Sequence, residues 1–405
     1  MKRLGDELIA SAATKVIEAK KNPIEYPEQA KRVKATVKGS KAQLRDYQTR
    51  ICSKVLGYYS EGVKSVLVEA PTGSGKTVMA MIIAKAVQVE KGCKVGIVTA
   101  RRELLRQAAA CNNDMGFDIE DLETISMFAN ADNIPTDIDM LIVDEAHRDA
   151  CNTMSVVHST IKPKLILGLT ATPFRADKVG LSFERVVKDA NIYELVRQGY
   201  LAHFDHYTVD SWNPEHLADV YLADPERWGK SIFFFHQMEH CRILADRLTA
   251  AGVRCEIVRG GTGKIRERQI EEFKNPDSGL NVLINMMVLT EGFDYPALKT
   301  VWVRPSVKGC TTQMGGRVFR IDEMTGRKQV VQCKETKWPF TRLAPATGQY
   351  LWQDQKWLSL VVNEKIDEIA NDMAKKIARV DWQSEEQVRM MSLFNKLGQK
   401  KRRWV

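Results

Sequence analysis

The sequence lacks the long apolar runs that mark membrane proteins and the leader that marks secreted ones. No uninterrupted apolar run in its 405 residues reaches the about 18 residues that a transmembrane helix needs. Charged residues recur throughout positions 1–21, so no signal peptide is predicted. These absences argue against an integral membrane protein or a secreted protein, and we expect the protein to work in the cytoplasm.

Paired cysteines are also missing. The eight cysteines are scattered, without a C-x-x-C pair and without a histidine at ligand spacing. This distribution favours reduced thiols and predicts no zinc site.

What is present is an ordinary globular composition with a basic balance. Hydrophobic residues make up 44% of the chain, and the formal net charge is +9. A chain of this length exceeds what one hydrophobic core supports, so two domains are expected. The positive charge favours a polyanionic partner, although many basic proteins bind no nucleic acid.

The residues that carry most information are Val66–Thr77, VLVEAPTGSGKT. Three apolar residues predict a buried strand, and the apolar spacing from Lys76 to Gln88 predicts a helix. A strand, a glycine-containing loop and a helix in this order form a phosphate cradle. The loop residues expected to line it are Pro71, Thr72, Gly73, Ser74 and Gly75, with Lys76 on the β- and γ-phosphates and Thr77 on Mg²⁺. A glycine-rich turn without a ligand is the alternative, and the intact GKT triplet disfavours it.

Strand-like and helix-like segments alternate along most of the chain, which predicts α/β domains with parallel sheets. The expected strands are 65–69, 94–99, 140–143 and 165–169, and then 231–235, 254–258, 281–284, 300–303 and 329–332. We therefore expect a helical extension (1–40), a first domain (41–208), a linker (209–228), a second domain (229–335) and a tail of uncertain fold (336–405). Aromatic residues between Trp338 and Trp357 could stack nucleobases, but a small hydrophobic core under the tail is the favoured interpretation.

Two acidic residues follow the predicted strand 140–143. Ligands bind at the carboxyl ends of strands in such sheets, which places Asp144 and Glu145 at the mouth of the predicted site. Asp144 is expected to hold Mg²⁺ together with Thr77. Glu145 is expected to accept a proton from the attacking water.

The phosphate loop and the tetrapeptide Asp144-Glu145-Ala146-His147 resemble motifs I and II of superfamily 2 helicases, in the DEAH-box branch. Further segments in the same order resemble the Q-type motif and motifs Ia, III, V and VI: 44–48, 98–104, 170–173, 289–294 and 313–320. The resemblance implies two tandem RecA-like domains, the P-loop NTPase fold, with ATP and Mg²⁺ between them. It covers roughly residues 43–335.

The resemblance also implies roles for residues outside the phosphate loop. Gln48, with Arg45, would read the adenine edge, and Gly292 and Asp294 would lie at the nucleotide. Gln313, Arg317 and Arg320 belong to QMGGRVFR; the two arginines are expected one turn apart on a helix that faces the nucleotide from the second domain. Two surface arginines on an exposed helix are the alternative. Coupling of hydrolysis to strand movement is implied for His147, Thr170 and Thr172.

Contacts with the nucleic-acid backbone are expected from a smaller set. Arg101 and Arg102 follow a predicted strand end, although solvated helix charges are the alternative. The other members match the backbone-contacting positions of the family: Thr124, Arg259, Gly260 and Thr290. Contacts of this kind give affinity without sequence preference.

Four stretches resemble RadD-type bacterial repair helicases and phage recombination helicases most: 170–175, 194–201, 289–296 and 313–320. They imply an ATP-dependent DNA helicase or translocase acting on single-stranded or branched DNA in recombination, repair or replication, in the cytoplasm of a bacterial or phage-infected cell. An RNA helicase of the same mechanism and the motor of a restriction or defence assembly remain alternatives. The cysteine-bearing zinc element that follows motif VI in some relatives is missing here.

Overall fold

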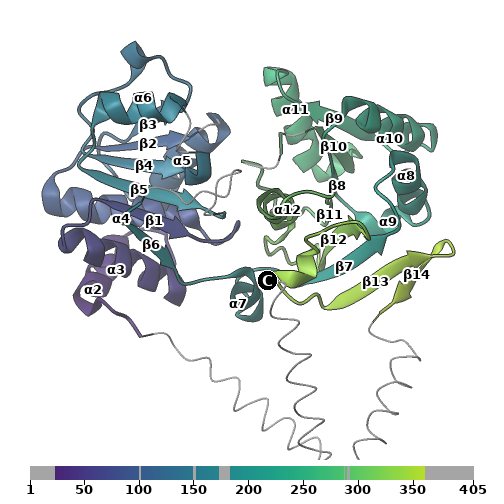
Figure 1. Cartoon of the computed structure of the whole chain (residues 1–405), viewed down its shortest axis with the longest axis horizontal. Coiled ribbons are helices and arrows are strands. Elements are labelled where there is room, and N and C mark those ends of the chain that lie inside the picture. The colour runs from purple at the N-terminus through teal and green to yellow at the C-terminus, as the bar shows by residue number, and fades with distance from the viewer. Residues whose placement is uncertain are drawn as a thin grey trace, which may run out of the picture.

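Two β-sheets, each covered by helices, organise the chain into two domains (Figure 1). The computed structural model describes residues 23–99, 102–148, 152–172, 183–286, 288–289 and 292–360. Both domains have the predicted α/β architecture with tandem sheets that are parallel except for one antiparallel pair at the edge of the second, so the fold expected from the alternation is confirmed.

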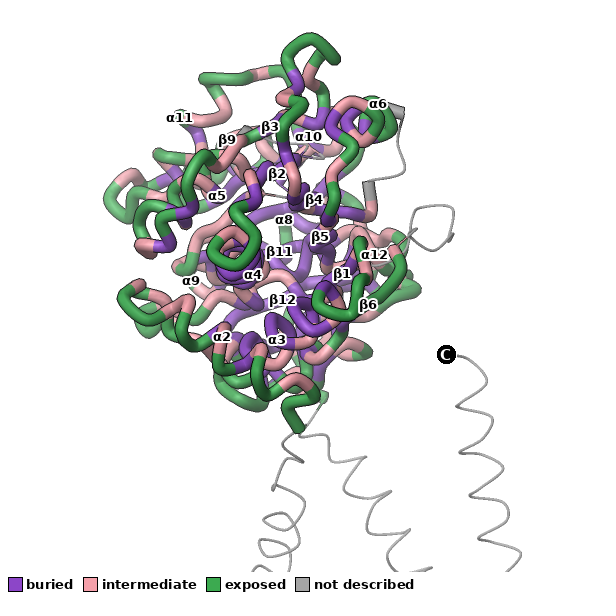
Figure 2. The backbone as a smooth tube through the Cα atoms, turned by 90° about the vertical axis from the view of Figure 1, so that its left-hand side faces the viewer, coloured by how far each residue is buried: buried purple, intermediate pink, exposed green. Residues whose placement is uncertain are grey.

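The first domain is built on a six-stranded sheet in the order β3-β2-β4-β5-β1-β6, in which every strand pair is parallel. Its strands are β1 (Ser65–Glu69), β2 (Val95–Thr99), β3 (Glu123–Ser126), β4 (Met140–Asp144), β5 (Leu165–Thr170) and β6 (Arg185–Lys188). Its helices are α3 (Asp46–Ser60), α4 (Lys76–Lys91), α5 (Arg102–Met115) and α6 (Asn152–Ile161). The near-continuous apolar sequence of the central strands fits their burial from both faces (Figure 2).

The end of the predicted N-terminal extension belongs to this domain. Helix α2 (Pro27–Val37) packs against α3 and α4, and it buries Ala30 and Val33. Residues 1–22 of the predicted extension lie outside the described residues.

The second domain is built on an eight-stranded sheet in the order β14-β13-β7-β12-β11-β8-β10-β9. Its strands are β7 (Phe204–Val209), β8 (Ser231–Phe235), β9 (Cys255–Arg259), β10 (Val282–Met286), β11 (Thr300–Trp302), β12 (Lys328–Cys333), β13 (Gly348–Gln353) and β14 (Lys356–Ser359). Its helices are α8 (Pro214–Leu222), α9 (Pro225–Trp228), α10 (Met238–Ala250), α11 (Gly263–Lys274) and α12 (Lys308–Gly315). Helix α7 (Ile192–Arg197) lies between the two domains (Figure 1).

The boundary between the domains differs from the expected one. Strand β7 pairs with β12 and β13 of the second sheet, and α8 packs against α10. Residues 204–228 therefore belong to the second domain, and the connection is the earlier segment around α7. The stretch 210–229 is polar on average, which suggested a linker, but Leu217, Tyr221 and Trp228 form a buried face.

The start of the tail also joins the second sheet. The Tyr350 ring stacks on Tyr207 with centroids 4.7 Å apart, and the Trp357 ring meets Tyr207 edge-on at 4.9 Å. Trp352 is buried in the same cluster. These aromatic residues form the favoured small hydrophobic core instead of a base-stacking surface. Trp338, in contrast, is 38% exposed.

None of the helices in the described ranges is long and apolar enough to cross a membrane.

Candidate functional site

The phosphate loop connects the carboxyl end of β1 to the first residue of α4. Gly73 and Gly75 have φ angles of 84° and 78°, a left-handed conformation that side chains with a Cβ rarely adopt. A Cβ on Gly75 would also lie 2.6 Å from Gln48 Nε2. These two positions therefore require glycine, and the loop wraps the N-terminus of α4 as a phosphate cradle would.

Lys76 lies at the first position of α4 and its ammonium folds over the loop. Lys76 Nζ donates to the Ala70 carbonyl at 3.1 Å and to the Pro71 carbonyl at 3.3 Å. Burial lowers the pKa of Lys76, and the carboxylates of Glu145 and Asp144 oppose this shift. A partly buried cation beside helix N–H groups is suited to binding phosphate.

The loop carries further groups that fit a nucleotide. Ser74 Oγ is buried and has no hydrogen-bond partner among the described residues. Thr77 lies in the first turn of α4 and is partly exposed. A hydroxyl and a carboxylate are hard oxygen ligands, the kind that Mg²⁺ prefers, so the chemistry of Thr77 in α4 and of Asp144 at the end of β4 fits the metal role expected of them.

The acidic pair lies where β4 ends, two strands from β1 in the sheet. The Glu145 N–H donates to Asp144 Oδ1 at 3.0 Å, and Glu145 has a φ of 52°. A left-handed backbone at a residue other than glycine is strained, and such strain clusters at functional sites. Glu145 is only 8% exposed, and its Oε2 lies 3.4 Å from His147 Nδ1.

The three residues expected to couple hydrolysis to movement lie together. His147 Nδ1 is 3.4 Å from Thr170 Oγ1 at the end of β5. Thr170 Oγ1 also donates to the Thr172 carbonyl at 2.9 Å and accepts from the Thr172 N–H at 3.0 Å. A Cβ on Gly309 of α12 would lie 3.5 Å from Thr172 Cγ2, so this cluster meets the second domain.

Gln48 forms a buried link between α3 and the phosphate loop. Its Oε1 accepts from the Arg45 N–H at 3.0 Å, and its Nε2 donates to the Ser74 carbonyl at 3.0 Å. Tyr47 OH donates to the same carbonyl at 2.6 Å. Gln48 and Tyr47 therefore hold the phosphate loop, a role that was not predicted for either residue. The signal available in the sequence was that Tyr47 and Gln48 are neighbours in the motif 44–48.

Arg320 extends from the second domain to the phosphate loop. Its Nε and Nη2 donate to Asp294 Oδ1 and Oδ2 at 2.9 and 3.0 Å. Its Nη1 donates to the Gly73 carbonyl at 3.5 Å. The bidentate pair fixes the guanidinium plane, and the third contact crosses between the domains.

The expected helix through both arginines is wrong. Helix α12 ends at Gly315, a 3₁₀ turn covers Gly316–Val318, and Arg320 lies beyond it. A Cβ on Gly316 would lie 3.1 Å from Thr72, so the backbone approaches the loop directly. Arg317 is buried within this turn.

The remaining members of the predicted nucleotide set lie around these arginines. Arg317 Nη1 donates to the Phe293 carbonyl at 3.1 Å. Gly292 O accepts from Gln107 Nε2 of α5 at 3.1 Å. Gln313 is buried in α12.

Comparison with protein families matches both domains. Residues 41–116 and 117–175 match the family described as type III restriction enzyme, res subunit, and residues 212–322 match the helicase conserved C-terminal domain. The two matches together cover more than half of the chain and lie in both domains. The chain belongs to helicase superfamily 2.

Curated relatives of this superfamily 2 chain include a 51.5 kDa protein of Lactococcus phage (isolate 7-9), 24% identical over 59% of this chain and 59% of the relative. Another is IRC3 of Saccharomyces cerevisiae, an ATP-dependent helicase by name, 26% identical over 69% of this chain and 49% of the relative. The matches thus span only about half to three fifths of these two relatives.

Solved structures share the fold of the superfamily 2 chain. One is a fragment from Vibrio vulnificus YJ016, assigned as an HsdR subunit of a type I restriction enzyme. It is 18% identical to this chain, with a TM-score of 0.59, and the match covers 80% of this chain and 72% of the fragment. Saccharomyces cerevisiae Dbp5, solved with RNA and ADP BeF3, is 17% identical with a TM-score of 0.55, covering 78% and 90%.

Residues predicted to contact nucleic acid lie on the outer strands of both sheets. Thr124 is exposed on β3, an edge strand of the first sheet. Arg259 ends β9, an edge strand of the second, and Gly260 follows it. Arg101 and Thr290 lie outside the described residues, and of Arg102 only its place at the start of α5 is described.

The two domains of the superfamily 2 chain also meet through α5 and α11, the helices that follow β2 and β9. Arg106 Nη1 of α5 forms an ion pair with Glu267 Oε1 of α11 at 3.1 Å.

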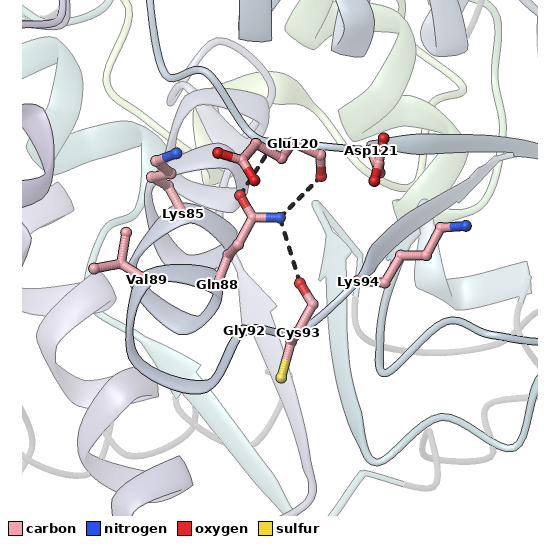
Figure 3. Close-up of a pocket in the computed structure, with 8 residues that line it drawn as sticks. All are labelled: Lys85, Gln88, Val89, Gly92, Cys93, Lys94, Glu120 and Asp121. Carbon is pink, nitrogen blue, oxygen red and sulfur yellow. Dashed lines mark hydrogen bonds between the residues drawn. The ribbon is translucent and has the colours of Figure 1, made fainter.

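A shallow hollow lies at the opposite end of α4 from Lys76. Gln88 holds its wall, donating to the Glu120 carbonyl at 2.9 Å and accepting from the Glu120 N–H at 3.0 Å (Figure 3). Lys85 and Lys94 line it as well. A 16-residue helix spans about 24 Å, so this hollow is separate from the nucleotide site.

Proposed function

We propose that this chain is an ATP-dependent DNA helicase or translocase that binds ATP and Mg²⁺ between its two domains. The observation that carries the proposal is the contact of Arg320 with the carbonyl of Gly73. It brings a fixed positive charge of the second domain to the phosphate loop of the first. A site shared in this way makes hydrolysis depend on how the two domains are arranged.

In the first domain, the loop amides and Lys76 would bind the phosphates. Thr77 and Asp144 would hold Mg²⁺, which when bound neutralises phosphate charge. Glu145 would orient the attacking water and take its proton, a contribution typically worth ~10²–10⁴ in rate. Its buried position and its contact with His147 support this assignment.

In the second domain, Arg317 and Arg320 would stabilise the charge that develops on the transferred phosphoryl group. A guanidinium suits this role because its charge is permanent and its planar fork matches phosphate oxygens. Loss of the γ-phosphate would remove the ligand that the two domains share, and the cleft would open. The Thr170–Thr172 cluster, which meets Gly309 of the second domain, would carry that change between domains.

DNA is the proposed substrate, and recombination, repair or replication the proposed setting. Exposed Thr124 and Arg259 are suited to phosphate contacts that carry no sequence preference. The similarity to a phage protein agrees with a phage or bacterial recombination helicase. Assignment to the DEAH-box branch and to the RadD type rests on the sequence motifs.

A motor subunit in a restriction assembly is the second candidate. It is favoured by the match of residues 41–175 to the family described as type III restriction enzyme, res subunit. In such an assembly, translocation by this chain would serve a nuclease carried by a partner.

The proposal is tested by the ATPase rate of the purified chain. The rate is measured in parallel with single-stranded DNA, duplex DNA, forked DNA and RNA. We expect DNA to stimulate turnover and the Lys76→Ala variant to show none. Stimulation by RNA alone would replace DNA by RNA as the substrate. No stimulation by any of the four would refute the proposal.

A further inference from the structure

The segment Gly199–Ala202, called the strap below, leads from α7 into the second domain. Gly199 has a φ of 71°, and the N–H groups of Tyr200 and Leu201 both donate to the Leu195 carbonyl, at 2.8 and 3.1 Å. These bonds close the end of α7 and fix the direction in which the strap leaves it. The strap is therefore an ordered connection.

Successive strap residues touch parts of the nucleotide site in both domains. Leu201 is 1% exposed, and its Cδ2 lies 2.9 Å from the position a Cβ on Gly73 would take, so it packs directly against the phosphate loop. The Ala202 N–H donates to the Phe319 carbonyl at 2.9 Å. Phe319 immediately precedes Arg320, so the strap also holds the arginine-bearing segment.

Tyr200 contacts the start of α3, where the base of a nucleotide is expected. The guanidinium carbon of Arg45 lies 4.8 Å from the centre of the Tyr200 ring. Arg45 Nη1 donates to the Tyr200 carbonyl at 3.5 Å and to Tyr47 OH at 3.3 Å. The rings of Tyr47 and Tyr200 lie 5.7 Å apart. The long Arg45 side chain is thus held from two sides although it is partly exposed.

A guanidinium held in this way is suited to a purine. Its plane stacks on flat π systems, and its N–H groups donate to ring nitrogens. A flexible arginine would lose rotamer freedom on binding, whereas one already stacked on Tyr200 loses less.

We propose that Tyr200 is a positioning residue that holds Arg45 against the purine base of the bound nucleotide. The inference rests on the proposed ATP site and adds to it a residue from the interdomain connection. The strap would then contact three parts of the site: Arg45 at the base, the phosphate loop and the segment that carries Arg320.

The test compares binding of ATP with binding of inorganic tripolyphosphate, which carries the phosphates without the base. Equilibrium dissociation constants are measured on the full chain for Tyr200→Ala, Tyr200→Phe and the control Tyr193→Ala. Tyr193 is the matched control because it lies on α7, next to the strap, and is 42% exposed.

Tyr200→Ala should weaken ATP about tenfold, the scale of a partly desolvated cation–π contact, and leave tripolyphosphate within about twofold. Tyr200→Phe should keep ATP affinity within about twofold, because the ring and the main-chain carbonyl make the contacts with Arg45. Tyr193→Ala should match the wild type. The rate at saturating ATP should change less than the Michaelis constant.

A double-mutant cycle sharpens the test. If Tyr200 acts through Arg45, the pair Arg45→Ala and Tyr200→Ala should bind ATP no worse than Arg45→Ala alone. Additive losses, an equal loss for ATP and tripolyphosphate, or unchanged ATP binding in Tyr200→Ala would each overturn the proposal. If wild-type turnover is not stimulated by nucleic acid, the proposed function fails, but these binding measurements still decide the role of Tyr200.

Discussion

The two domains use the end of a central strand in different ways. In the first domain, β1 is followed by the loop with two left-handed glycines and then by α4. In the second domain, only His236 and Gln237 separate β8 from α10. A short connection without glycine leaves the backbone no room to wrap a phosphate, so the second domain offers no cradle at β8.

What the second domain offers instead is fixed positive charge. Asp294 orients Arg320 toward the loop, and Arg317 is anchored on the Phe293 carbonyl. We propose a division of labour, in which the first domain supplies most of the binding energy for the nucleotide and the second supplies most of the rate. The predictions below test this division.

The largest effect is expected where the first domain is disabled. Lys76→Ala should abolish ATP turnover and weaken ATP binding, because it removes the cation over the phosphate loop. Steady-state ATPase and equilibrium binding measure both effects. Turnover within about threefold of wild type would remove Lys76 from the phosphate-binding role assigned to it.

Glu145→Gln separates binding from chemistry within the first domain. The amide keeps the shape of the side chain but is a far weaker base, so hydrolysis should fall by ~10²–10⁴ while ATP still binds. Single-turnover hydrolysis is compared with equilibrium binding of the same variant. A variant that no longer binds ATP would show that Glu145 serves the structure of the site.

Gln48→Ala tests whether base reading belongs to the first domain. Loss of a bidentate contact with adenine corresponds to about 1–3 kcal/mol by analogy with base readout, so the preference for ATP over GTP should fall. Because Gln48 also holds the Ser74 carbonyl, affinity for both nucleotides should drop. If the wild type already uses both nucleotides equally, the assignment is wrong.

The smallest effect on turnover is expected in the antiparallel strands β13 and β14 at the edge of the second sheet. Trp352→Ala removes a side chain buried against Trp357. The free energy of unfolding of the second domain should therefore fall by about 3–5 kcal/mol. ATP affinity should stay close to the wild-type value. Denaturant unfolding measures the change, and the half-exposed Trp338→Ala is the control. Equal effects of both variants would contradict the buried position of Trp352.

Much of the fold and of the nucleotide site could be predicted from local patterns. The strands around Val66–Val68 and Met140–Val143 are apolar runs, and the glycine before Lys76 marks the loop. Each of these sequence patterns is contained within a few consecutive residues. The place of residues 204–228 could not be predicted in this way. It depends on the pairing of β7 with β12, a contact between segments more than a hundred residues apart.

The same limit applies within the site. Helix α12 ends at Gly315, where the ring of Phe340 leaves no room for a side chain, since it lies 2.1 Å from the position of a Cβ on that glycine. Neither this contact nor the stacking of Tyr200 on Arg45 leaves a periodic trace in the sequence. The motifs therefore located the loop before Lys76 and the segment that carries Arg320, but they gave no sign of the contacts that Phe340 and Tyr200 make with these parts.

The central claim is that one nucleotide is bound by the first domain and cleaved with the help of the second. The most direct test measures ATP affinity and nucleic-acid-stimulated ATPase for wild type, Arg320→Ala, Arg320→Lys and the control Arg327→Ala, whose side chain is exposed. Arg320→Ala should keep most of the affinity and lose ~10³ or more of the rate, as for an arginine finger. Arg320→Lys should recover little of that rate because a point charge does not reproduce the planar fork, and Arg327→Ala should behave as wild type. An Arg320→Ala variant with near wild-type turnover would contradict the shared site.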